Sequence, residues 1–302
     1  MTGWSMLPLA ELTTADMLSF EEKLQGQQQF MLWLYGPVFL IGLILLIGFT
    51  LYQRQRPIDW SWSLHRLERR PWTWPAAAWV VFPLMAAQVV FHLALILFGV
   101  EVDVESGGEG ATLLLILQSL VFHWLCFVLI AAGLWVRRTS WNAAFGIDGP
   151  GLFPDMVAGV LVMLGVMPLV IGYNVVAGMV MEWMDYTPRV QEVTRIIAEP
   201  GHGFTSAYLV GLAVVVAPVV EELLFRGILL PAIARLSGVK PAIVIVSLLF
   251  ALVHGAYLPQ FGIFFILSVA FCLAYLHRGS IVTPIAMHAL FNGLTVAVIM
   301  RL

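Results

Sequence analysis

Three charged residues interrupt an apolar stretch in the last third of the chain, in the order Glu-Glu-x-x-x-Arg from Glu221 to Arg226. On a helix, Glu222 and Arg226 lie four positions apart on one face, which permits a salt bridge. Glu221 points about 100° away from Glu222 and stays available for other chemistry. Because charge inside an apolar helix is costly unless it is paired or faces water, these residues indicate a functional site.

Two later apolar stretches carry polar residues at helical spacing. Phe250 and His254 are four positions apart, and so are His288 and Asn292. A glutamate and a histidine can together hold a water molecule, with the carboxylate as general base. A second histidine and an asparagine can donate hydrogen bonds to a developing oxyanion. Glu221, His254, His288 and Asn292 are therefore the parts needed to hydrolyse an amide without a covalent nucleophile.

The same residues could instead bind a metal ion. Glu221, His254 and His288 are a possible zinc ligand set. The asparagine and the lack of an HExxH spacing favour a glutamate mechanism that uses no metal and no other cofactor. Cys126 and Cys272 both lie in apolar runs, and we interpret them as buried hydrophobic residues.

The elements that must hold these residues are membrane helices. Hydrophobic residues make up 61% of the 302-residue chain and charged residues only 11%, against roughly a quarter charged in soluble domains. The net charge of -3 and the lack of a basic stripe exclude a nucleic-acid partner. Hydropathy predicts an all-α, polytopic bundle with about eight spans. They run over residues 30–52, 75–100, 113–136, 156–181, 206–236, 241–254, 259–277 and 281–300.

These spans divide the chain into a variable region, residues 1–205, and a site-bearing core, residues 206–302, with about four spans each. A short amphipathic helix is also predicted near residues 190–197. Glu221 lies 14 positions before Arg235, and His254 lies 14 positions after Lys240, so each is about 20 Å from a basic helix end. His288 is about 12 Å from its helix end by the same rise. We therefore expect them to meet in an internal polar cavity.

Lysine and arginine concentrate in alternate loops, which predicts the orientation. The positive-inside rule puts these loops in the cytoplasm and both termini outside. The basic loops contain Arg54, Arg56, Arg66, Arg69, Arg70, Arg137, Arg138, Arg235, Lys240 and Arg278.

The three motifs, EExxxR, FxxxH and HxxxN in this order and in hydrophobic helices, resemble those of the CPBP family. That family comprises the CAAX prenyl endopeptidases and the bacterial Abi or bacteriocin-processing proteins. The resemblance covers residues 206–302 and implies an intramembrane endopeptidase of a bacterial plasma membrane, with its cavity open to the cytoplasm. Its substrate would be a membrane-embedded or lipidated protein or peptide.

By this resemblance, Glu221 and His254 would activate water, and His288 and Asn292 would form the oxyanion hole. Glu222 and Arg226 would hold the site together, beside Phe250. Two alternatives remain: a catalytically idle scaffold or immunity protein, and a proton- or ion-coupled transporter. His92 and His123 also lie in spans, and we interpret them as packing residues.

Overall fold

The structure is a computed structural model that describes residues 14–98, 109–147, 151–186, 203–254 and 258–301. All regular secondary structure in these ranges is helical, which confirms the predicted all-α class. The helix predicted near residues 190–197 lies outside the described residues. The first helices are α1 (Thr14–Gln55), α2 (Trp60–Glu68), α3 (Trp74–Leu97), α4 (Glu109–Val136), α5 (Trp141–Phe145) and α6 (Leu152–Trp183). They are followed by α8 (Gly203–Gly211), α9 (Ala217–Glu222), α10 (Leu230–Ser237), α11 (Val239–His254), α12 (Leu258–Arg278) and α13 (Val282–Ile299).

Seven helices in the described ranges are long and apolar enough to span a bilayer. One of them, Thr205–Ser237, joins α8, α9 and α10 into a continuous 33-residue span. The remaining predicted span, residues 241–254, corresponds to α11, an apolar helix of 16 residues, about 24 Å long at 1.5 Å per residue. The chain is therefore an integral, multi-pass membrane protein.

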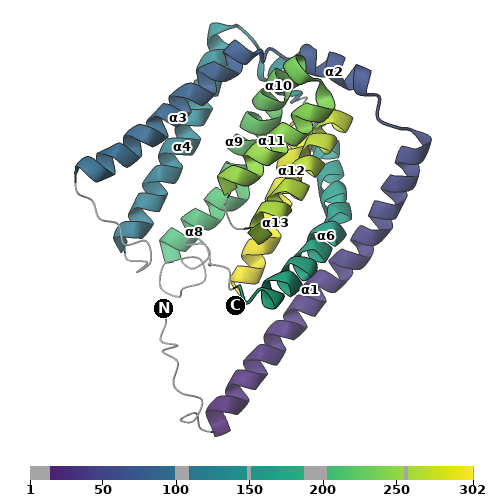
Figure 1. Ribbon diagram of the computed structural model, residues 1–302, viewed down its shortest axis with the longest axis vertical. Coiled ribbons are helices and arrows are strands. Elements are labelled where there is room, and N and C mark those ends of the chain that lie inside the picture. Colours follow the sequence, from purple (N-terminus) through teal and green to yellow (C-terminus); the bar gives the residue numbers. More distant parts are fainter. Residues whose placement is uncertain (1–13, 99–108, 148–150, 187–202, 255–257, 302) are drawn as a thin grey trace.

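The helices run alternately up and down (Figure 1). The end of α1, the surface helix α2, α5 and the α10–α11 and α12–α13 turns gather at one end of the bundle. This end carries the basic loops that the sequence analysis placed together on one side of the membrane. The beginning of α1 and the end of α13 lie at the opposite end (Figure 1).

Two π-helical segments interrupt the long span, η3 (Leu212–Val216) before α9 and η4 (Leu223–Leu229) after it. In a π-helix each N–H donates to the carbonyl five residues earlier. Thus Ala217 donates to the Leu212 carbonyl, and Leu230 donates to the Phe225 carbonyl. A proline follows each of these donors, Pro218 and Pro231, and proline has no N–H to continue the pattern. Each π-helical segment therefore ends two positions before a proline.

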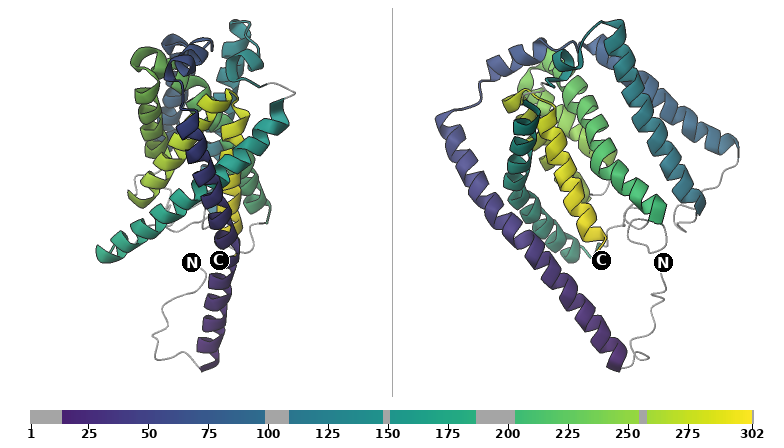
Figure 2. Two further views of the ribbon diagram at one scale, coloured as in Figure 1. Left: turned by 90° about the vertical axis from the view of Figure 1, so that its right-hand side faces the viewer. Right: turned by 180° about the vertical axis from the view of Figure 1, so that it is seen from behind.

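Helices from both halves of the chain pack together around the long span. Seen from behind, α1 and α6 lie on one side of α13, and the α3–α4 hairpin lies at the other edge (Figure 2). α6 packs against α1, α12 and α13, and α4 packs against α9. The boundary at residues 205/206 stays a prediction.

Small residues allow the closest of these contacts. A Cβ atom at Gly159 of α6 would lie 2.5 Å from the Thr283 carbonyl oxygen of α13, so only glycine lets the two backbones come this close. Gly42 of α1 faces the Leu164 carbonyl of α6 in the same way. The Gly159 contact sets how closely α6 approaches α13, which carries His288 and Asn292.

Candidate active site

The centre of the site is a fully buried ion pair. Arg226 Nη1 donates to Glu222 Oε1 over 2.8 Å, and both side chains have 0% of their surface exposed. The predicted pairing across one turn is therefore present. His288 Nδ1 lies 2.9 Å from the same Glu222 oxygen. One carboxylate oxygen thus joins the long span to α13.

The second terminal nitrogen of Arg226 reaches α12. Arg226 Nη2 donates to the Ser268 hydroxyl over 2.6 Å. The guanidinium carbon lies 4.5 Å from the ring centre of Phe250 and 5.0 Å from that of Phe271, within the range of cation–π attraction. The arginine thereby holds α11 and α12 against the long span.

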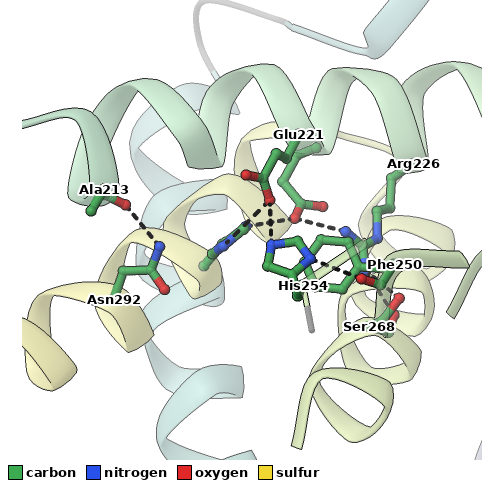
Figure 3. Close-up of polar contacts among 9 residues, drawn as sticks. Ala213, Glu221, Arg226, Phe250, His254, Ser268 and Asn292 are labelled. Atoms are coloured by element: carbon green, nitrogen blue, oxygen red, sulfur yellow. Dashed lines mark hydrogen bonds and ion pairs between the residues drawn. The ribbon is translucent and has the colours of Figure 1, made fainter. Parts of the chain in front are cut away.

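Glu221 faces a different group from Glu222. Its Oε2 atom lies 3.0 Å from His254 Nε2 and 4.0 Å from His288 Nε2. Figure 3 shows Glu221 and Arg226 projecting from one helix, with His254 opposite Glu221. The Glu221 and His254 side chains are 14% and 21% exposed, whereas Glu222 is fully buried. The two adjacent glutamates therefore differ in environment: one is closed into the core and the other is accessible.

The hydrogen bonds of His254 determine how many protons lie between Glu221 and His254. Its Nδ1 lies 2.8 Å from the Phe250 carbonyl oxygen, which can only accept, so we assign the hydrogen to Nδ1. In a neutral ring Nε2 is then also an acceptor, and it would face the Glu221 carboxylate without a hydrogen between them. The Glu221–His254 pair therefore shares an additional proton, as imidazolium with carboxylate or as imidazole with carboxylic acid.

His288 has the same constraint. Its Nδ1 donates to Glu222, which leaves Nε2 directed toward Glu221. Nε2 can donate a hydrogen bond only when the ring is protonated on both nitrogens. The Phe271 ring stacks on His288 with its centroid 5.3 Å away, and Phe250 stacks on His254 at 4.2 Å. These rings fix the orientation of both imidazoles.

Asn292 lies apart from the ion-pair contacts. Its Nδ2 donates to the Ala213 carbonyl oxygen over 2.7 Å (Figure 3). In the π-helical register the nitrogen of Pro218 would face this carbonyl, but it carries no hydrogen. The proline therefore leaves an acceptor that Asn292 occupies. The second amide hydrogen of Asn292 is not used by this bond.

The structure thus brings together Glu221, His254 and His288, with Glu222, Arg226 and Phe250 behind them. Asn292 is on the same face of α13 as His288, but it is tied to η3. Sequence reasoning missed Ser268 and Phe271, although a serine three positions from an aromatic residue in an apolar helix was a usable signal. It also missed the bond between His288 and Glu222.

A metal ion in this site would need several ligand side chains that converge on one point. Within the described ranges, no group of three or more His, Cys, Asp or Glu side chains converges so that it could hold a metal ion. His288 directs Nδ1 to Glu222 and keeps Nε2 4.0 Å from Glu221.

Comparison with protein families gives a match over residues 203–294, to the model described as "Type II CAAX prenyl endopeptidase Rce1-like". Over residues 203–294, the CPBP segment, the chain is therefore similar to this family. This CPBP segment contains the whole of α9 to α12 and every site residue described above. A comparison with curated proteins found no match, and neither did a comparison with solved structures. The resemblance inferred from the three motifs is confirmed over this segment.

Proposed function

We propose that this protein is an intramembrane endopeptidase in which Glu221 activates water to hydrolyse a peptide bond. The observation that carries this proposal is the contrast between the two glutamates. Glu222 is closed off by Arg226 and His288, whereas Glu221 is partly exposed and contacts His254. The membership of residues 203–294 in a family of CAAX-type endopeptidases supports it.

The proposed reaction begins with Glu221 as carboxylate and His254 as imidazolium. Glu221 removes a proton from water, and the resulting hydroxide attacks the peptide carbonyl carbon. The tetrahedral intermediate then collapses and its C–N bond breaks. The leaving nitrogen takes a proton from Glu221 or His254, and the products are a carboxylic acid and an amine, which together contain all the atoms of the amide and the water. Placement of these groups inside the bundle strengthens each electrostatic interaction.

Asn292 and His288 are the proposed donors to the oxyanion. Asn292 can donate its second amide hydrogen while the first stays on the Ala213 carbonyl. His288 can donate only from Nε2 of a doubly protonated ring, because Nδ1 already serves Glu222. The buried Glu222 carboxylate would support that imidazolium. Of the two, Asn292 is thus the donor that needs no change of protonation.

The substrate we propose is a membrane-associated protein or peptide, including a lipidated one, that enters from the cytoplasmic side. The site lies within helices that cross a bilayer, so an apolar or prenylated chain can approach it through lipid. Both termini would then lie outside, in a bacterial plasma membrane. The variable region, residues 1–205, would shape the substrate path.

The experiment that tests this function is cleavage by the purified protein reconstituted in lipid vesicles. The probes are a farnesylated peptide with a C-terminal CAAX sequence, the same peptide without the prenyl group, and a library of single-span membrane peptides. Cleavage by wild type that is lost in His254→Ala and His288→Ala supports the proposal. Cleavage that is unaffected by both substitutions would contradict it.

Metal removal separates the two chemistries that the sequence left open. We expect a chelator to leave the cleavage rate within about twofold of the untreated rate, because the proposed steps use only side chains and water. The measurement is the initial rate with and without chelator, followed by addition of zinc. Loss of activity that zinc restores would instead assign Glu221, His254 and His288 as metal ligands.

Replacement of Pro218 tests how the π-helix positions Asn292. In Pro218→Ala the new N–H competes with Asn292 for the Ala213 carbonyl, and loss of one positioning hydrogen bond is worth about 1 kcal/mol. We therefore expect cleavage to fall about fivefold to tenfold, with no loss of thermal stability, since proline is unfavourable inside a helix. Rate and melting temperature are measured together. Pro231→Ala, which follows the second π segment, is the matched control and should stay near wild type.

A further inference from the structure

α4 lies outside the CPBP segment, yet it packs directly against α9, which carries Glu221. His123 lies in the middle of α4, 14 positions before Arg137, and Glu221 lies 14 positions before Arg235. α4 and the long span both end at the basic end of the bundle (Figure 1). At 1.5 Å per residue, both side chains are about 20 Å from that end. His123 and Glu221 therefore lie at matching depth on neighbouring helices.

The face of α4 that carries His123 is buried inside the bundle. Cys126 is three positions further along and shares this face. Both side chains are buried, with His123 at 8% exposure and Cys126 at 0%. Each is close enough to the Glu221 carboxylate to interact with it electrostatically. Two buried positions on one helix face thus interact with the same carboxylate.

The hydrogen bonding of His123 is incomplete at Nε2. Nδ1 lies 2.6 Å from the Ser119 carbonyl oxygen, so we assign the hydrogen to Nδ1, and Nε2 is an acceptor in the neutral ring. Nε2 is buried and has no hydrogen-bond partner in the part of the chain that the structure describes. Glu221 Oε2 lies 3.0 Å from His254 Nε2, and a carboxylate can accept further hydrogen bonds beside that contact. Buried polar atoms in native proteins are usually satisfied, and a water molecule between His123 and Glu221 would supply the donor that His123 Nε2 lacks.

We propose that His123 is a positioning residue for the water that Glu221 activates, accepting one of its hydrogens at Nε2 while Glu221 removes the other. A water molecule has two hydrogens, so it can satisfy both acceptors at once. With both hydrogens directed into the protein, a lone pair of the oxygen is left to face the substrate carbonyl. His123 keeps its protonation state throughout, since the proton passes to Glu221. The inference rests on the proposed hydrolysis and assigns a part of the site to the region outside the CPBP segment.

Two substitutions distinguish this role from packing. His123→Phe keeps an aromatic ring but removes the acceptor, and we expect kcat to fall about 10- to 100-fold with KM unchanged. His123→Gln keeps an acceptor near the Nε2 position, and we expect it to retain most of the activity. A packing role predicts the reverse order, because phenylalanine suits an apolar helix better than glutamine does. A Phe variant as active as wild type, or more active than the Gln variant, overturns the proposal.

His92 is the matched control. It also follows a phenylalanine and directs Nδ1 to the carbonyl four residues earlier, Gln88, but its side chain is exposed on α3. His92→Phe and His92→Gln should both retain wild-type kcat. The assay uses a library peptide that wild type cleaves and Glu221→Gln does not. If Glu221→Gln cleaves as well as wild type, the proposed function has failed; if it is inactive and His123→Phe is fully active, only the role of His123 has failed.

A second measurement does not depend on activity. NMR of protein labelled at the histidine side-chain nitrogens reports the environment of Nε2 directly. Glu221→Gln is expected to shift the Nε2 resonance of His123 more than that of His92. Equal responses of the two histidines would overturn the proposal even if no peptide is cleaved.

Discussion

Glu221→Gln is expected to lower the cleavage rate by about 10²- to 10⁴-fold, the usual contribution of a general base. Glutamine has nearly the shape of glutamate but cannot accept the proton of the attacking water. Because Glu221 is partly exposed and outside the Arg226 pair, the substitution should leave folding intact. The measurement is the initial rate in vesicles, together with the melting temperature of the purified variant.

Glu182→Gln is the control for loss of a carboxylate. Glu182 is exposed near the end of α6, far in sequence from the site residues. It should cleave at the wild-type rate. A Glu221→Gln variant that keeps more than about a tenth of wild-type activity would show that another group is the base. The idle-scaffold alternative would gain if wild type and variant were equally inactive on every probe.

Arg226→Met is expected to destabilise the protein by about 3–5 kcal/mol, the cost of leaving a buried charge without its partner. Methionine retains much of the aliphatic volume but loses the bonds to Glu222 and Ser268. It also loses the cation–π contacts with Phe250 and Phe271. The measurement is the free energy of unfolding in mixed micelles by denaturant titration.

Two comparisons isolate the charge. Arg137→Met removes an exposed arginine at the end of α4 and should change stability by less than about 0.5 kcal/mol. The double variant Glu222→Leu/Arg226→Met removes both charges and should recover part of the loss. Recovery stays incomplete because His288 loses the acceptor of its Nδ1 hydrogen. A double variant no more stable than Arg226→Met would contradict the role of the unpaired carboxylate.

The pairs within one helix followed from the sequence alone. Helical periodicity determines that residues four positions apart share a face, and this predicted the contact of Glu222 with Arg226. It also predicted that Glu221 points elsewhere. Hydropathy predicted the spans, because a bilayer requires long apolar helices.

The contacts between helices needed the tertiary structure. The rotation and tilt of α13 against the long span determine two sets of contacts. His288 meets both Glu222 and Glu221, and Asn292 meets Ala213. Close packing decides that rotation, for example where Gly159 meets Thr283, and no local pattern encodes it.

Sequence analysis assigned His123 to packing. Only the tertiary structure revealed that α4 packs against α9, which carries Glu221, and that His123 Nε2 is buried without a hydrogen-bond partner among the described residues. The sequence by itself determined which residues could do chemistry and in which helices they lie, because periodicity and hydropathy act along one chain segment. The tertiary structure decided which of them meet, because side-chain packing between distant segments sets the distances.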